Sequence, residues 1–126
     1  MHEAEGIMRL LEGLKKNHGS IRACMVAKRG LEGLIMFPQS FKEEVAGVWE
    51  PLSKNVDDML LLVSRYSQVG LNRSYTEILG YGVFFLALPG SDTALIAFVK
   101  EDDPLKEAAQ ITAQMEKTRS LLLDSL

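Results

Sequence analysis

The sequence predicts an α/β fold in which helices cover both faces of a β-sheet, with the element order α-β-β-α-β-β-β-α. Apolar residues recur at helical spacing in residues 3–18, 40–69 and 103–126. Residues 83–88 and 94–99 are instead apolar throughout, and turn-forming residues join them. Because strands that are apolar on both faces must be covered on both faces, we place these two at the centre of the sheet.

The first helix is predicted over residues 3–18, and Gly19 ends it because glycine tolerates the left-handed conformation of a helix C-terminus. Its apolar stripe consists of Ile7, Leu10, Leu11 and Leu14.

Residues 20–28 then follow the period of a strand. One face carries Ile21, Ala23, Met25 and Ala27, and the other carries Cys24 and Val26. Arg29–Gly30 is predicted to turn the chain into a returning strand over residues 31–37, which Pro38 ends.

A long helix is predicted over residues 40–69. Ser40 and Glu43 match a capping box, in which each side chain accepts a hydrogen bond from the backbone amide of the other. Pro51 lies inside this helix and lacks an amide hydrogen, so we expect a kink or a break near Trp49–Glu50.

Three strands and a last helix follow. Residues 72–79 mix strand formers with polar residues, Gly80-Tyr81-Gly82 is predicted to form a turn, and residues 89–92 form the loop between the two apolar strands. Asp103 and Pro104 suit the N-cap and first position of the final helix. The predicted buried side of that helix consists of Leu105, Ala108, Ala109, Ile111, Met115, Leu122 and Leu126.

Length and composition indicate a single domain over residues 1–126, with 47% hydrophobic and 25% charged residues. The net charge of −3 and the lack of a Lys/Arg cluster argue against nucleic-acid binding. No apolar stretch is long enough for membrane insertion. Cys24 is the only cysteine, which excludes an intramolecular disulfide and a Cys-rich zinc site. The acidic N-terminus lacks the basic region of a signal peptide, so we expect a cytoplasmic protein.

We find no catalytic, cofactor-binding or metal-binding constellation in the sequence. Cys24 and His18 could pair as nucleophile and base, but Cys24 alternates within an apolar strand as a small hydrophobic residue does. The acidic pairs at 57–58 and 102–103 are interpreted as a solvated helix face and a helix cap. Residues 80–82 lack the following helix and the GK[ST] signature of a phosphate loop. The sequence therefore predicts a protein that is not an enzyme and needs no cofactor.

The long helix carries more apolar surface than one sheet can cover. Residues 59–63 are apolar around the whole circumference, so part of this turn must face a partner subunit, or else the last helix or a loop of the same chain. The strand at 72–79 is the most polar and is expected at an edge, where a second copy could pair with it. The candidate dimer interface comprises Trp49, Met59, Leu61, Leu62, Val63, Tyr66, Arg73, Tyr75, Thr76 and Glu77. For Trp49 the sequence supports two interpretations equally, a residue of the core and an anchor of the interface.

Several segments resemble the Roadblock/dynein light chain family over almost the whole chain. Residues 19–26 followed by 29–31 look like its first hairpin, residues 80–85 and 88–96 are similar to its closing hairpin, and 103–105 match the start of its last helix. The resemblance implies a profilin-like, five-stranded antiparallel sheet between one long helix and the two terminal helices. It also implies homodimers formed through the long helix and the third strand.

Members of that family are associated with small Ras-like GTPases, so the resemblance implies a non-catalytic adaptor or regulator of such a GTPase. No arginine can be nominated as a finger supplied in trans, so any stimulation would reposition the GTPase's own residues. A small-molecule sensor of profilin-like or PAS-like topology, with a cavity lined by Phe84, Phe98 and Met25, is the alternative. An enzyme with a site completed across the dimer is a third reading, which the shortage of His, Cys and paired acids disfavours.

Overall fold

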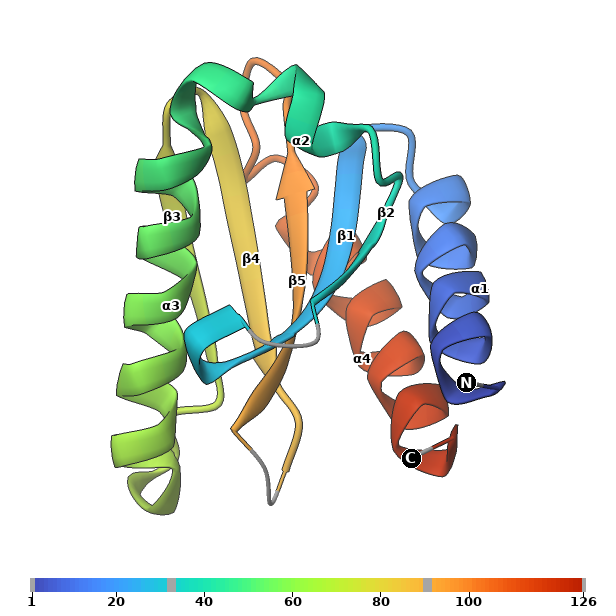
Figure 1. Cartoon of the computed structure of the whole chain (residues 1–126), viewed down its shortest axis with the longest axis vertical. Helices are drawn as coiled ribbons and strands as arrows, with labels where there is room; N and C mark the ends of the chain where they lie inside the picture. The colour runs from blue at the N-terminus through green and yellow to red at the C-terminus, as the bar shows by residue number, and fades with distance from the viewer. Residues whose placement is uncertain (1, 32–33, 90–91, 126) are drawn as a thin grey trace.

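The computed structural model describes residues 2–31, 34–89 and 92–125. Its sheet has five antiparallel strands in the order β2-β1-β5-β4-β3 (Figure 1). The strands are β1 (Ile21–Lys28), β2 (Ile35–Phe37), β3 (Arg73–Ile78), β4 (Tyr81–Ala87) and β5 (Thr93–Val99). The predicted α+β fold is confirmed, and β3 lies at an edge as expected.

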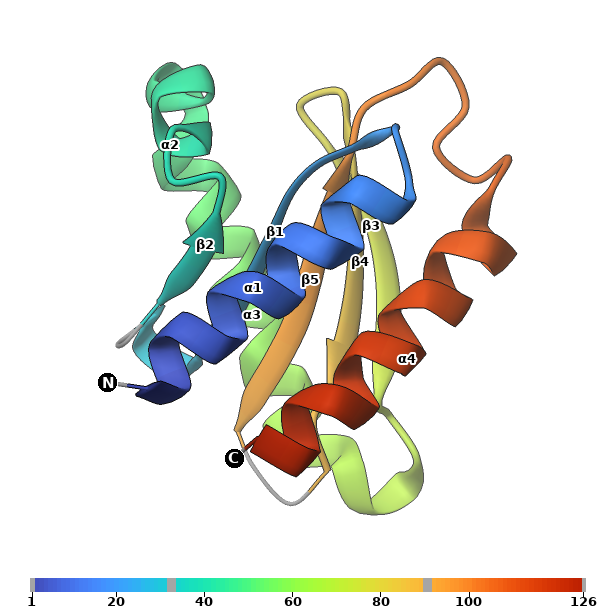
Figure 2. The ribbon, with the colours of Figure 1, turned by 90° about the vertical axis from the view of Figure 1, so that its right-hand side faces the viewer.

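Helices cover both faces of the sheet, as the apolar strands require. Figure 2 shows α1 (His2–Asn17) and α4 (Ala108–Ser125) on one face and α3 (Trp49–Tyr66) beyond the opposite face. Among the described residues, no helix has both the length and the apolar character that a membrane crossing requires.

The side chains on the two faces form separate cores. Met25, Leu60 and Phe98 belong to the core under α3. Leu11 and Ile111 belong to the core under α1 and α4. Every residue of β4 is buried, which explains why this strand is apolar throughout.

Ile21 is the exception to the predicted alternation of β1. It lies in the core under α1 and α4, whereas Ala23, Met25 and Ala27 lie under α3. The pairing of β1 with β5 shifts register between Ile21 and Ala23, and one irregular position moves a side chain to the other face.

The predicted long helix is broken directly before Trp49, close to the expected place. It consists of α2 (Phe41–Glu44), a 3-10 turn η2 (Ala46–Val48) and then α3. Pro51 lies in the first turn of α3, where backbone amides have no partner within the helix in any case. It therefore marks the start of α3 rather than a kink within it.

Other predicted boundaries are corrected by the local backbone. No side-chain bond caps α2, so the capping box at Ser40 does not form. Tyr81 and Gly82 belong to β4, and the turn is made by Leu79 and Gly80, which both have positive φ angles. In the last segment, α4 begins only at Ala108, so Leu105 precedes the helix and is exposed.

The turn after β1 also differs, because a 3-10 turn η1 (Arg29–Leu31) comes before β2. Residues 32–33 of the predicted second strand, residues 90–91 of the predicted loop, and Leu126 lie outside the described residues.

Candidate interaction surface

β3 is the more open of the two sheet edges. It has six residues against three in β2, which also lies beside α1 (Figure 1). Within the described part of the chain, no strand pairs with the outer side of β3. A free strand edge of this length presents unpaired backbone groups that another strand can bind.

The side chains of β3 alternate between the two faces of the sheet. Arg73 is exposed and forms an ion pair with Glu116 of α4, with 3.0 Å between Nη2 and Oε1. Ser74 and Thr76 are half-buried, and the Ser74 Oγ is buried without a hydrogen-bond partner among the described residues. Glu77 is exposed. The β3 edge therefore carries a positive charge at Arg73, a negative charge at Glu77, and a Ser74 hydroxyl that has no hydrogen-bond partner among the described residues.

Tyr75 is held by its own subunit. Its ring packs edge-on against Phe84, with 4.8 Å between ring centroids. A Cβ atom on Gly82 would lie 2.8 Å from the Tyr75 hydroxyl and 2.6 Å from Pro104, so only glycine fits beneath the ring. Burial raises the pKa of Tyr75 to about 12. Tyr75 thus stiffens the middle of the open strand and stays a neutral phenol.

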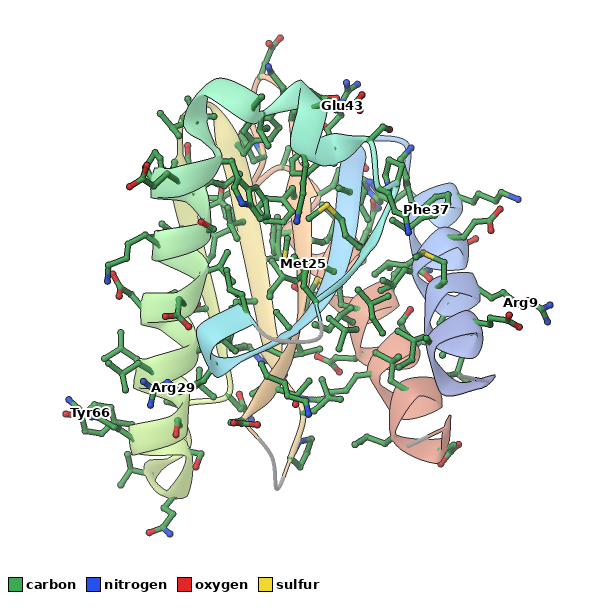
Figure 3. The ribbon with its side chains drawn as sticks, viewed as in Figure 1. Arg9, Met25, Arg29, Phe37, Glu43 and Tyr66 are labelled. Carbon is green, nitrogen blue, oxygen red and sulfur yellow. The ribbon has the colours of Figure 1, made fainter. Side chains whose placement is uncertain are left out.

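An apolar strip runs along α3 and past its end, exposed except at Met59, which is half-buried and packs against the core under α3. Met59, Leu62, Tyr66 and Val69 follow one another at intervals of three or four residues, and we call them the α3 outer face. Leu62 is 41% exposed, Tyr66 49% and Val69 81%. Figure 3 shows Tyr66 projecting away from the sheet.

The orientation of α3 points this strip past β3. Asp57, on the opposite flank of the helix, accepts a hydrogen bond from the Gly30 amide next to β1. Because β1 lies toward the far side of the sheet from β3, the α3 outer face is directed beyond the β3 edge. The two predicted interface elements therefore share one side of the molecule, at the left of Figure 1.

Two of the predicted interface residues, Val63 and Trp49, pack against the core of their own subunit. Val63 is only 4% exposed and packs in the core under α3, because it follows the buried positions Leu52, Val56 and Leu60 at helical spacing. Leu61 is half-buried. Trp49 packs against the same core, and the Lys42 Nζ lies 5.1 Å from its ring centroid.

Sequence reasoning missed exposed apolar residues at the ends of this surface. Val69 lies in η3 (Ser67–Val69), past the end of α3, and Leu79 lies in the turn after β3. The signal for Val69 was its spacing of three residues from Tyr66. Nothing in the local sequence signals Leu79, since leucine rarely adopts the positive φ found there.

A cluster of ionisable groups fixes α2 to the sheet. Arg22 donates to both carboxylate oxygens of Glu44, at 2.7 and 3.3 Å, and the Tyr81 hydroxyl donates to Glu44 Oε2 at 2.8 Å. The hydrogen bond from Arg22 is the main cause that lowers the pKa of Glu44. Burial, followed by the bond to Glu44, raises the pKa of Tyr81 to about 12. These groups satisfy one another, so we assign them a structural role.

His18 and Cys24 do not form a catalytic pair. The His18 ring contacts Ser20 through Nδ1 and Glu107 through Nε2, at 2.8 and 2.7 Å. Burial raises the pKa of the Cys24 thiol to about 12, which removes the thiolate needed for nucleophilic chemistry. Within the described ranges, no cluster of three or more His, Cys, Asp or Glu residues is placed to hold a metal ion.

The layer between the sheet and α3 is filled. The void beside Met25, Trp49 and Phe98 has no room for a water molecule. Phe84 faces the other core, so it cannot line a cavity together with Phe98 and Met25. A pocket of about 560 Å³ lies instead at the end of α3, next to Asn72 and Arg119. The cavity expected for a small-molecule sensor is therefore not formed by these residues.

Comparisons with known proteins agree with this architecture. No protein-family model matches the sequence, and no curated protein sequence matches it. The structure is similar to that of MglB from Myxococcus xanthus, with a TM-score of 0.67 and 11% identity over 100% of this chain and 94% of that one. It is also similar to MglC from Myxococcus xanthus, with a TM-score of 0.63 and 13% identity over 92% and 98% of the two chains. A Roadblock/LC7 domain from Streptomyces avermitilis gives a TM-score of 0.61 and 15% identity over 92% and 93%. These likenesses show that the chain has a Roadblock/LC7-like fold.

Proposed function

We propose that this chain, with its Roadblock/LC7-like fold, is a non-catalytic homodimeric adaptor or regulator that binds a small Ras-like GTPase in the cytoplasm. The position of the exposed α3 outer face beside the open β3 edge carries the dimer part of this proposal. The resemblance of the sequence to the Roadblock/dynein light chain family supports the GTPase part. We take residues 1–126 to act as one domain.

The proposed interface uses the same patch on both subunits, as a two-fold dimer requires. Its apolar part is the α3 outer face, with Leu61 at its margin, and its polar part is β3. Burying Leu62 and Tyr66 against their copies would remove apolar surface from water, which is the main driving force of association. Val63 is left out of this interface because it packs in its own core.

The adaptor role is supported by the chemistry of the described side chains. Cys24 is buried and His18 is engaged by Ser20 and Glu107, so neither is free for catalysis. We assign any effect on GTP hydrolysis to repositioning of the GTPase's own residues.

A nucleotide-dependent capture experiment tests the GTPase part. The immobilised chain is incubated with native lysate containing GDP, a non-hydrolysable GTP analogue, or EDTA without nucleotide. We expect mass spectrometry to find a small Ras-like GTPase enriched in one of these states and not in the others. Recovery of no small GTPase in any state would contradict the proposal.

Leu62→Asp provides the matched variant for the same capture, because its side chain is exposed and its loss should not disturb the core. If the dimer forms the docking platform, this variant captures less GTPase than the wild type. Ser120→Asp on the exposed side of α4 is the control and should capture as much as the wild type.

A further inference from the structure

We infer that β3 pairs with β3 of a second copy in one register, which places Tyr75 opposite the partner's Tyr75 and Arg73 opposite the partner's Glu77. This inference rests on the proposed dimer and specifies how its two copies recognise each other. Three independent features of β3 lead to it: the direction of its backbone groups, its charges, and the unused Ser74 hydroxyl.

The backbone direction limits the possible registers. The amide of Ala87 donates to the carbonyl of Asn72 at 2.7 Å, in line with the pairing of Arg73 with Leu86. The backbone amide and carbonyl groups of successive residues alternate in direction along a strand. In β3, those of the even-numbered residues bond to β4, and those of the odd-numbered residues point away from the sheet edge. The outward residues are Arg73, Tyr75 and Glu77. In an antiparallel pair, outward residues must face outward residues of the partner.

Three symmetric registers satisfy this rule with substantial overlap. They place the two-fold axis at Ser74, at Tyr75 or at Thr76. Only the register centred on Tyr75 lets all three outward residues of each copy bond to outward residues of the other. Shifting the axis to Ser74 or Thr76 leaves one outward residue of β3 without a β3 partner.

The charges favour the same register. With the axis at Tyr75, Arg73 faces the partner's Glu77 twice per dimer, and directly opposed opposite charges stabilise a strand pair. With the axis at Ser74 or Thr76, neither charge faces its complement. Arg73 already contacts Glu116 of α4, so the partner's Glu77 would join an existing ion pair on that face.

The opposite face of the strand is also self-complementary in this register. Ser74 would lie directly across from the partner's Thr76, in a pair whose side chains approach closely and can share a hydrogen bond. The Ser74 Oγ is buried without a hydrogen-bond partner among the described residues, and a buried polar group of this kind is normally paired. The partner's Thr76 hydroxyl would supply the missing bond.

Charge reversal tests the energetic part. Arg73→Glu places two acids opposite each other, and Glu77→Arg places two bases opposite each other, so each variant alone should dimerise about tenfold more weakly. The double variant Arg73→Glu/Glu77→Arg restores both pairs and should dimerise as the wild type does. Glu116→Lys is the control, because it breaks the ion pair that Arg73 makes within its own subunit while leaving the sequence of β3 unchanged. A double variant as weak as the single ones would overturn the inference.

Disulfide trapping tests the register itself. Directly opposed residues of this pair type have Cα atoms about 4.5 Å apart, within the range of about 4.4–6.8 Å that a disulfide spans. Ser74→Cys alone should cross-link only with the axis at Ser74, and Thr76→Cys alone only with the axis at Thr76. A mixture of the two variants should cross-link Ser74→Cys to Thr76→Cys only with the axis at Tyr75. Cys24 is buried and will not compete.

We expect disulfide-linked dimers in the mixture after mild oxidation and none in either variant alone, with the linked peptides identified by mass spectrometry. Cross-linking within a single variant, or none in the mixture while light scattering shows a dimer, would overturn the register and leave the proposed dimer standing. A wild-type monomer in light scattering would overturn both the register and the proposed dimer.

Discussion

The backbone amide of Gly30 donates a hydrogen bond of 2.7 Å to the Asp57 carboxylate, which joins the turn after β1 to the middle of α3. The next residue, Asp58, pairs instead with Lys54 one turn earlier in the same helix. The two adjacent acids, predicted to be a solvated helix face, therefore have different roles. The bond made by Asp57 agrees with the rotation of α3, in which one flank of the helix faces β1 and the opposite flank faces past β3.

Asp57→Ala should lower the free energy of unfolding by about 1 kcal/mol, because the Gly30 amide loses its acceptor. Asp58→Ala removes only an exposed ion pair with Lys54 and should cost less than Asp57→Ala does. Urea denaturation of both variants measures the difference. An equal loss of unfolding free energy in the two variants would show that the hydrogen bond from Gly30 contributes no more to stability than the exposed ion pair does.

Glu44 should make stability depend on pH in the acid range. Its folded-state pKa is lowered, chiefly by the hydrogen bond from Arg22 and also by the one from Tyr81. Its contribution is therefore present above the unfolded pKa of about 4.3 and is lost as pH falls through the folded value. Because the Arg22 side chain is half exposed, we expect Glu44→Gln to cost no more than about 1 kcal/mol at pH 7.

Urea denaturation at a series of pH values measures this effect. The difference between the wild type and Glu44→Gln should close as pH falls below about 4.3. Glu43→Gln, on the exposed side of α2, is the control and should show a small difference at every pH. A Glu44→Gln difference that persists at pH 2 would rule out this ion pair as its source.

Leu79 should be a site where substitution stabilises the chain. It has a φ of 56° and is followed by Gly80 at 84°, a two-residue turn in which asparagine followed by glycine is strongly preferred. Leu79→Asn should raise the free energy of unfolding by about 0.5–1 kcal/mol. Leu79→Ala keeps the strained backbone without the amide side chain and should give no such gain. Thermal unfolding compares the two.

Cys24 should be inert in the native protein. Burial raises the pKa of its thiol to about 12, so thiolate is scarce at neutral pH. A maleimide should label the wild type at pH 8 only when denaturant is present, as followed by mass spectrometry. Ser120→Cys, at an exposed position of α4, should be labelled without denaturant. Rapid native labelling of Cys24 would contradict its placement.

The sequence was sufficient for the fold because its local signals agree with the tertiary structure. Residues 83–88 and 94–99 are apolar throughout since both faces of β4 and β5 are covered, and the spacing of Leu52, Val56 and Leu60 matches the buried side of α3. What failed were positions set by contacts distant in sequence. Ile21 changes face because of how β1 meets β5, which alternation along one strand cannot reveal.

For the candidate surface too, local sequence signals predicted part of the structure, and contacts distant in sequence decided the rest. An apolar circumference at residues 59–63 correctly indicated more apolar surface than the sheet covers, since Leu62 is exposed. It could not tell Leu62 from Val63, because that choice depends on the rotation of α3 about its own axis. That rotation agrees with the bond between Asp57 and Gly30, a contact across 27 residues.

The most direct test of the whole account is the mass of the chain in solution. Sedimentation equilibrium of the wild type should give twice the 14.0 kDa of one chain, and Leu62→Asp and Tyr66→Asp should shift the equilibrium toward the monomer. Ser120→Asp should sediment as the wild type does. A wild type that remains at 14.0 kDa at high concentration would contradict the dimer, and with it the function proposed for the α3 outer face and β3.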